Sequence, residues 1–201
     1  MHYVGNAGSA AEANRNYFES LKNGLLNSAG QYTYASSHYI VGLNGEILRC
    51  VPENEIAYCS NDRNSDTISI ENCHPDAAGK FNDKTAASLV ELAADICTRY
   101  GLDAKTQVIR HYDITKKLCP LYYVNYPDAW TQFRQKVADA VTAGKKVAQA
   151  DPLAALPQWQ QDVFNASVKE GRLNTPEYWK PKLAQPISTI DALALIRAHM
   201  Q

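Results

Sequence analysis

The chain has 201 residues, of which 45% are hydrophobic, so it can form one domain of ordinary size, alone or with a small appendage, around a sizeable core. Twenty basic against 21 acidic side chains leave a net charge of −1, so composition favours neither nucleic acid nor an anionic membrane as a partner. No apolar run is long enough for membrane insertion, and the N-terminus lacks the features of a signal peptide. We therefore expect the chain as written to stay in the cytoplasm unless something else releases it.

Helix-forming composition predicts a first helix within residues 10–24. Residues 36–52 contain two β-rich runs, and the Asn-Gly pair at 44–45 between them is typical of a tight hairpin turn. Residues 66–73 alternate like a third strand. This alternation places Glu71 on the face opposite the apolar one.

Apolar residues at helical spacing predict an amphipathic helix over 84–100, which Gly101 ends. Residues 106–112 are β-rich and predict another strand, which carries His111 at its end. A further helix is expected over 127–144, with its apolar residues on one stripe.

The last quarter of the chain differs in composition from the rest. Small, charged and proline residues at 147–157 predict a linker, which separates a first domain of residues 1–146 from a small helical module of residues 158–201. Within that module two helices are expected, and the second begins at a capping box formed by Ser188 and Asp191.

The segment HYDITKKLCP places a histidine, His111, eight residues before a thiol, Cys119. A loop could return both to one zinc ion, since catalytic zinc takes three ligands from His, Cys and carboxylates and keeps a fourth position open. Taken alone, the pair fits a backbone-bonded histidine and a buried thiol better than a metal site. The five cysteines are odd in number and unevenly spaced, unlike a disulfide framework. Spacing does not choose a third ligand among the remaining histidines, which are His2, His38, His74 and His199.

Four motifs occur in the order found in one known family. They are HYVGNAGSAAEANRNYF, ASSHYIVGLNGEILRCVPENEIAY, TISIENC and VIRHYDITKKLCP. The chain in this way resembles, over residues 1–135, the zinc-dependent N-acetylmuramoyl-L-alanine amidases of the type-2 family, which includes phage endolysins and peptidoglycan recognition proteins. The resemblance implies an α/β fold, with a mixed central β-sheet flanked by helices and a zinc ion in a groove on one side.

The resemblance also assigns roles to individual residues. Position by position, it makes His2, His111 and Cys119 the zinc ligands. It makes Glu71 the general base, as in the endolysin branch, and Lys117 the cation that stabilises the oxyanion. Without the resemblance, Glu71 would be read as a solvated strand residue and Lys117 as an exposed loop cation.

Other polar residues near these motifs are given structural roles, and two positions depart from the family pattern. We expect Asp113 to orient its loop and His38 to make a structural hydrogen bond away from the site. Ser37 stands where some relatives have a catalytic tyrosine. Cys59 ends the sequence AYC where many relatives have AWH, so the contribution of that histidine to substrate binding is in doubt here.

His2 directly follows Met1, whereas relatives usually have a full β-strand before this histidine, so either most of that strand is missing or the start codon is placed too late. If that strand is missing, the imidazole is expected at a fraying terminus with weakened zinc affinity, because chain ends are ordered only when they are tied down. A chain extended upstream should then bind zinc more tightly.

The resemblance implies hydrolysis of the amide between N-acetylmuramic acid and L-alanine, with peptidoglycan as the partner and Zn²⁺ as the cofactor. The alternatives are a non-catalytic peptidoglycan-binding module of the same fold and a structural zinc site on another scaffold. The absent signal peptide is typical of an endolysin that a holin releases to the cell wall, and equally of a bacterial autolysin or recycling enzyme. Residues 158–201 faintly resemble half of an S-layer-homology module, which predicts wall binding; the alternative is self-association into a homo-oligomer.

Overall fold

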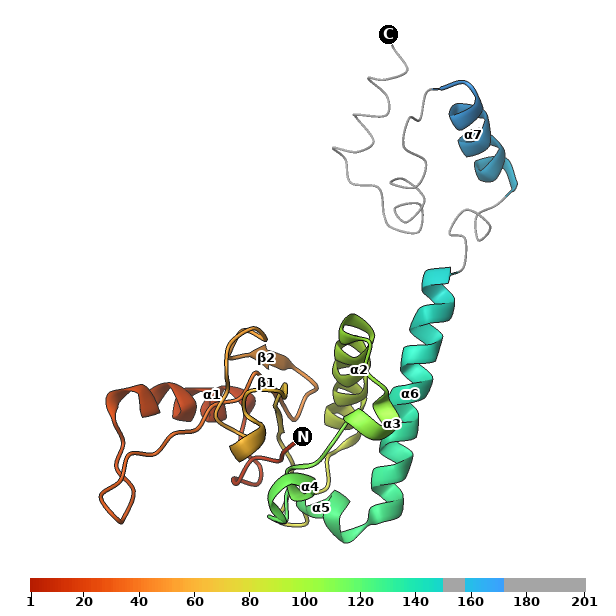
Figure 1. Cartoon of the computed structure of the whole chain (residues 1–201). Helices are drawn as coiled ribbons and strands as arrows, with labels where there is room; N and C mark the ends of the chain where they lie inside the picture. The colour runs from red at the N-terminus through yellow and green to blue at the C-terminus, as the bar shows by residue number, and fades with distance from the viewer. Residues whose placement is uncertain (150–157, 172–201) are drawn as a thin grey trace. The chain divides into compact units, whose positions relative to one another are not determined.

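The computed structural model of the chain describes residues 1–149 and 158–171 (Figure 1). The chain divides into two units, Met1–Thr142 and Ala143–Gln201. The first unit contains a mixed sheet and a group of helices, and it carries every residue to which a role was assigned. The mixed sheet with flanking helices confirms the predicted fold class.

A three-stranded sheet forms the centre of the first unit, in the order β2-β1-β3. Strands β1 (Tyr39–Val41) and β2 (Ile47–Arg49) are antiparallel, and β3 (Ile70–Asn72) is parallel to β1. Gly45 has φ +86° in the turn between β1 and β2, a conformation that glycine adopts without steric cost. The predicted hairpin and third strand are therefore confirmed.

The first residues of the chain lie along the free edge of β3. The amide of His2 donates to Ile70 O at 2.9 Å, and that of Val4 donates to Asn72 O at 3.0 Å. The Asn72 side chain returns a hydrogen bond to His2 O at 2.8 Å. His2 is 2% exposed, so this histidine is tied to the sheet, in contrast to the fraying terminus expected from its position.

The predicted N-terminal helix is α1 (Ala11–Ser20), which continues as a short 3-10 helix, η1 (Leu21–Asn23), and ends at Gly24. The second predicted helix is α2 (Asp83–Tyr100). Asn82 caps its start by accepting from an amide of the first turn, and Gly101, with φ +66°, ends it as expected.

Helices α2, α5 (Leu121–Asn125) and α6 (Pro127–Gln149) enclose the main apolar core. Its aromatic centre is formed by Trp130 and Phe133, whose rings stack with centroids 5.5 Å apart, and by Tyr123 against both. Helix α6 extends to residue 149, so the first three residues of the predicted linker are helical. The remaining linker residues lie outside the described part of the chain.

The strand predicted over residues 106–112 is wrong. Its first two residues belong to a short helix, α3 (Ala104–Gln107), and His111 is the first residue of another, α4 (His111–Thr115). The backbone of the extended stretch between these helices pairs with Met1, whose amine donates to Ile109 O and whose carbonyl accepts from the His111 amide. One residue of pairing is too little to make a strand, although the local sequence favours one.

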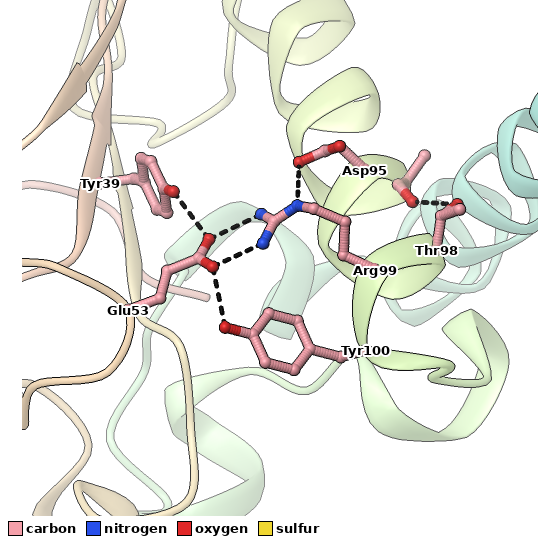
Figure 2. Close-up of polar contacts among 7 residues, drawn as sticks. Tyr39, Glu53, Asp95, Thr98, Arg99 and Tyr100 are labelled. Atoms are coloured by element: carbon pink, nitrogen blue, oxygen red, sulfur yellow. Dashed lines mark hydrogen bonds and ion pairs between the residues drawn. The ribbon is translucent and has the colours of Figure 1, made fainter. Parts of the chain in front are cut away.

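A polar cluster joins the segment after β2 to the last turn of α2 (Figure 2). Glu53 accepts two hydrogen bonds from the Arg99 guanidinium, at 2.6 and 2.7 Å. Tyr39 and Tyr100 donate to the same carboxylate at 2.7 and 2.9 Å, and Asp95 holds the far side of Arg99. These contacts, with the Arg99 hydrogen bonds foremost, lower the pKa of Glu53 to about 2.

In the second unit the structure describes the end of α6 and helix α7 (Gln158–Lys169), and α7 agrees with the first helix predicted for the tail. The helix predicted over 188–200 lies outside the described residues, and the predicted domain division stays a prediction. Among the helices of residues 1–149 and 158–171, none combines the length and apolar character needed to cross a membrane.

Candidate active site

Three side chains from distant parts of the chain meet in a buried cluster. His2 comes from the segment beside β3, His111 from the start of α4, and Cys119 from the loop that leads to α5. The Nδ1 atoms of the two histidines are 3.2 Å apart, and Cys119 Sγ is 3.9 Å from His2 Nδ1. One ligand atom of each residue lies within 4.8 Å of the others.

These separations fit a single bound zinc ion. With zinc bonds of about 2.0–2.1 Å to nitrogen and 2.3 Å to sulfur, tetrahedral angles separate two nitrogens by about 3.3 Å and a nitrogen and a sulfur by about 3.6 Å. The distances above agree to a few tenths of an ångström. Two imidazoles and one thiol are also a common donor set of catalytic zinc, which leaves a fourth position for water.

The outer nitrogens of both rings face a short 3-10 helix, η2 (Asn61–Arg63), and the residue before it. His2 Nε2 lies 3.3 Å from Ser60 Oγ, and His111 Nε2 lies 2.9 Å from Asn61 Oδ1. An amide oxygen only accepts, so His111 carries its proton on Nε2 and presents the Nδ1 lone pair to the cluster. Asn61 holds this position with φ +52°, a left-handed conformation that asparagine tolerates better than most residues.

Burial sets the protonation of the three groups. It lowers the pKa of His2 well below the usual histidine range and lowers that of His111 as well, so both imidazoles are neutral at pH 7. Burial raises the pKa of the Cys119 thiol to about 11. A positive ion in the cluster would favour the thiolate, because metal binding displaces the thiol proton.

Glu71, in the middle of β3, directs its carboxylate into the same cavity. Its Oε1 accepts from the Cys59 thiol at 3.4 Å, whereas its buried Oε2 has no hydrogen-bond partner among the residues that the structure describes. Burial raises the pKa of this carboxyl to about 7. A buried carboxylate oxygen without a partner among the described residues, beside a cluster of ligand-type atoms, is suited to a water molecule or a substrate proton.

 Lys117 follows the end of α4 and lines the same cavity, whose volume is about 300 Å³. The positive charge of Lys117 acts to lower the pKa of both Glu71 and His111, which places its ammonium within electrostatic reach of the cluster. The neighbouring Lys116 instead lies over the ring of Tyr112, 5.2 Å from its centroid.

The two residues expected to be structural lie away from the cavity. Asp113 forms an ion pair with Arg110 at 2.7 Å and accepts from the Arg110 amide, which caps α4. His38 is buried between the backbone of Ser69 and that of Glu55, with ring contacts of 3.0 Å to each. Both arrangements agree with the roles expected from the sequence.

Cys59 takes part in a second group of ligand-type atoms. Its thiol, one Glu71 oxygen and one His2 nitrogen also lie within 4.8 Å of one another. The two groups share His2, so a metal ion in one would compete with a metal ion in the other for that histidine. The AYC sequence therefore places a thiol against the carboxylate where many relatives carry a histidine.

Comparison with known proteins identifies the family. The sequence profile described as N-acetylmuramoyl-L-alanine amidase matches residues 1–121, more than half of the chain. The chain belongs to the N-acetylmuramoyl-L-alanine amidase family. It is 34% identical over 160 residues to N-acetylmuramoyl-L-alanine amidase CwlL of Bacillus licheniformis, a match that covers 74% of this chain and 42% of the relative. It is 29% identical over 172 residues to the amidase BlyA of Bacillus subtilis (strain 168), covering 76% and 43%.

Solved structures show the same fold at lower sequence identity. The PlyG catalytic domain superposes with a TM-score of 0.55 at 22% identity, covering 70% of this chain and 79% of that one. PlyL gives a TM-score of 0.53 at 21% identity, covering 68% and 79%. The chain spans less than half the length of the named amidases it matches.

Sequence reasoning missed the residues that contact the outer nitrogens of the two histidines. Ser60 and Asn61 were given no role, because neither residue type signals a contact with a histidine far away in sequence. The only local signal was the family departure at Cys59, which marks the segment just before them. Their contacts follow from the path of η2 past both rings.

Proposed function

We propose that this chain is a zinc-dependent hydrolase that cleaves the amide between N-acetylmuramic acid and L-alanine in peptidoglycan. One observation carries the proposal: two imidazole nitrogens and a thiol converge at zinc-compatible distances beside a buried carboxylate oxygen with no partner in the described residues. His2, His111 and Cys119 would hold the metal. When bound, zinc would supply a Lewis acid and a water that is acidic enough to attack near neutral pH.

The remaining steps belong to side chains of this protein. Glu71 accepts a proton from the attacking water and gives it to the leaving amine. As the carbonyl carbon of the substrate amide becomes tetrahedral, negative charge grows on its oxygen, and the Lys117 ammonium stabilises that negative charge. A single donor of this kind lowers the barrier by about 3 kcal/mol.

The non-catalytic binding module is the alternative on the same fold. It would be expected to lack a ligand or the general base, whereas this chain retains all five positions in one cavity. We therefore place catalysis first.

We further propose that the chain acts on the cell wall after release from the cell, and that residues 158–201 contribute wall binding. Removal of residues 150–201 should then reduce sedimentation of the protein with purified walls. Unchanged sedimentation would leave self-association as the role of this tail.

The activity is tested by release of L-alanine amino groups from purified Gram-positive peptidoglycan. We expect release by the wild-type chain, loss of release with Glu71→Gln and Cys119→Ser, and recovery of a chelated wild-type sample when zinc is restored. A wild-type chain that binds walls and contains zinc but releases no amine would favour the binding module.

A further inference from the structure

Three exposed tyrosines form a continuous row on the surface, here called the tyrosine row: Tyr32, Tyr34 and Tyr58. The ring centroids of Tyr32 and Tyr34 are 6.5 Å apart, and those of Tyr34 and Tyr58 are 6.2 Å apart. Their exposed fractions are 59%, 73% and 57%, so each ring offers most of its surface to solvent. Neighbouring exposed aromatic rings of this kind mark a binding surface more often than isolated ones do.

The backbone holds the row in place. Tyr32 and Tyr34 lie in the loop between α1 and β1 (Figure 1), two positions apart in an extended stretch, so their side chains share one face. The Thr33 amide donates to Leu25 O at 2.8 Å, which fixes this stretch against the preceding one. A Cβ added at Gly24 would lie 3.1 Å from the Tyr32 ring, so that ring rests close to the Gly24 backbone.

The row leads directly into the candidate active site. Ser36 and Tyr58 exchange hydrogen bonds, with the Ser36 amide donating to Tyr58 O at 3.1 Å and the Tyr58 amide donating to Ser36 Oγ at 2.8 Å. Tyr34 and Tyr58 line the cavity that contains Glu71. Tyr32 is the outermost ring and extends the surface beyond the cavity.

The segment that carries Tyr32 and Tyr34 is uncharged. Between Lys22 and Glu46 the sequence contains no Lys, Arg, Asp or Glu, but it is rich in Asn, Ser, Gln and Thr. Such a surface offers neither the ion pairs of a charged peptide nor the cations of a phosphate site. Aromatic faces carry a negative quadrupole, which attracts the weakly positive C–H groups on the face of a sugar ring, and the neutral polar side chains suit hydroxyl and acetamido groups.

We propose that the tyrosine row binds the glycan strand of the substrate, with successive N-acetylated sugar rings stacking from Tyr58 outward to Tyr32. The inference rests on the proposed amidase function. In that function the peptide on one N-acetylmuramic acid enters the cavity, and the glycan strand continues from that sugar along the tyrosine row. The row thereby favours polymeric substrate over a single muramyl-peptide unit.

The test measures binding of a peptide-free glycan strand of alternating N-acetylglucosamine and N-acetylmuramic acid by isothermal titration calorimetry. Tyr32→Ala and Tyr34→Ala should each weaken binding about three- to tenfold, the range expected for loss of one aromatic contact. Tyr34→Trp should retain binding, because the ring face is kept. Tyr126→Ala serves as the matched control, since Tyr126 is 56% exposed and does not line the cavity.

Wild-type protein that fails to bind the strand, or Tyr32→Ala and Tyr34→Ala proteins that bind it as the wild type does, would overturn the proposal. A change in the mass of the chain in solution with Tyr32→Ala, and no change in sugar binding, would assign the row to self-association instead. Because the strand contains no amide to the peptide, its binding is measured independently of hydrolysis. Failure of the amidase function would thus appear as strand binding without amine release.

Discussion

The helical core and the candidate active site of this chain are built in different ways. The core around Phe133 depends on helices whose apolar stripes are visible in the sequence, and its contacts join neighbouring elements. The site depends on single residues in loops and helix starts, and its two histidines are 109 positions apart. Stability and chemistry therefore reside in separable parts of one unit, and substitutions should affect one without the other.

The largest expected effect is on the core. Phe133 is 3% exposed and touches both Trp130 and Tyr123, so Phe133→Ala should lower the free energy of unfolding by about 3–5 kcal/mol in denaturant titrations. The zinc affinity of the folded protein should stay unchanged. A parallel loss of zinc affinity would show that the core and the site are not separable.

The converse substitution acts on the site. Asn61→Ala removes the acceptor that orients His111, and should weaken zinc binding about 10- to 100-fold in competition with a chelator. The free energy of unfolding of the metal-free protein should fall by only about 1–2 kcal/mol, because alanine adopts the left-handed conformation of position 61 less readily than asparagine. Asn61→Asp keeps an acceptor oxygen and should bind zinc more tightly than Asn61→Ala; equal affinity of wild type and Asn61→Ala would contradict the assigned role.

The smallest effect concerns pH and the cluster in Figure 2. The pKa of Glu53 is lowered in the folded state to about 2, so its contribution to stability is present above its ordinary pKa of 4.5 and is lost as the pH falls towards 2. Because Arg99 is 41% exposed, we expect only about 1–2 kcal/mol. The difference in unfolding free energy between wild type and Glu53→Gln should shrink over this pH range; a constant difference would argue against the ion pair.

The parts that the sequence predicted are those with local causes. The Asn44-Gly45 turn and the stripe of α2 were recognised because each is specified by neighbouring residues. The strand expected at 106–112 failed because strand formation needs a partner strand, and this stretch pairs with the single residue Met1 at the chain's start. The choice of His2 over the other histidines came from the family resemblance, since spacing alone carries no information on long-range contacts.

The most direct test of the account is the absorption spectrum of the cobalt-substituted protein. A thiolate bound to Co²⁺ gives charge-transfer absorption in the near ultraviolet, so the two thiols near the site can be distinguished by substitution. If His2, His111 and Cys119 hold the metal, this absorption is present in the wild type, persists in Cys59→Ser and is lost in Cys119→Ser. Absorption that persists in Cys119→Ser and disappears in Cys59→Ser would contradict the account and assign the metal to the group that contains Glu71.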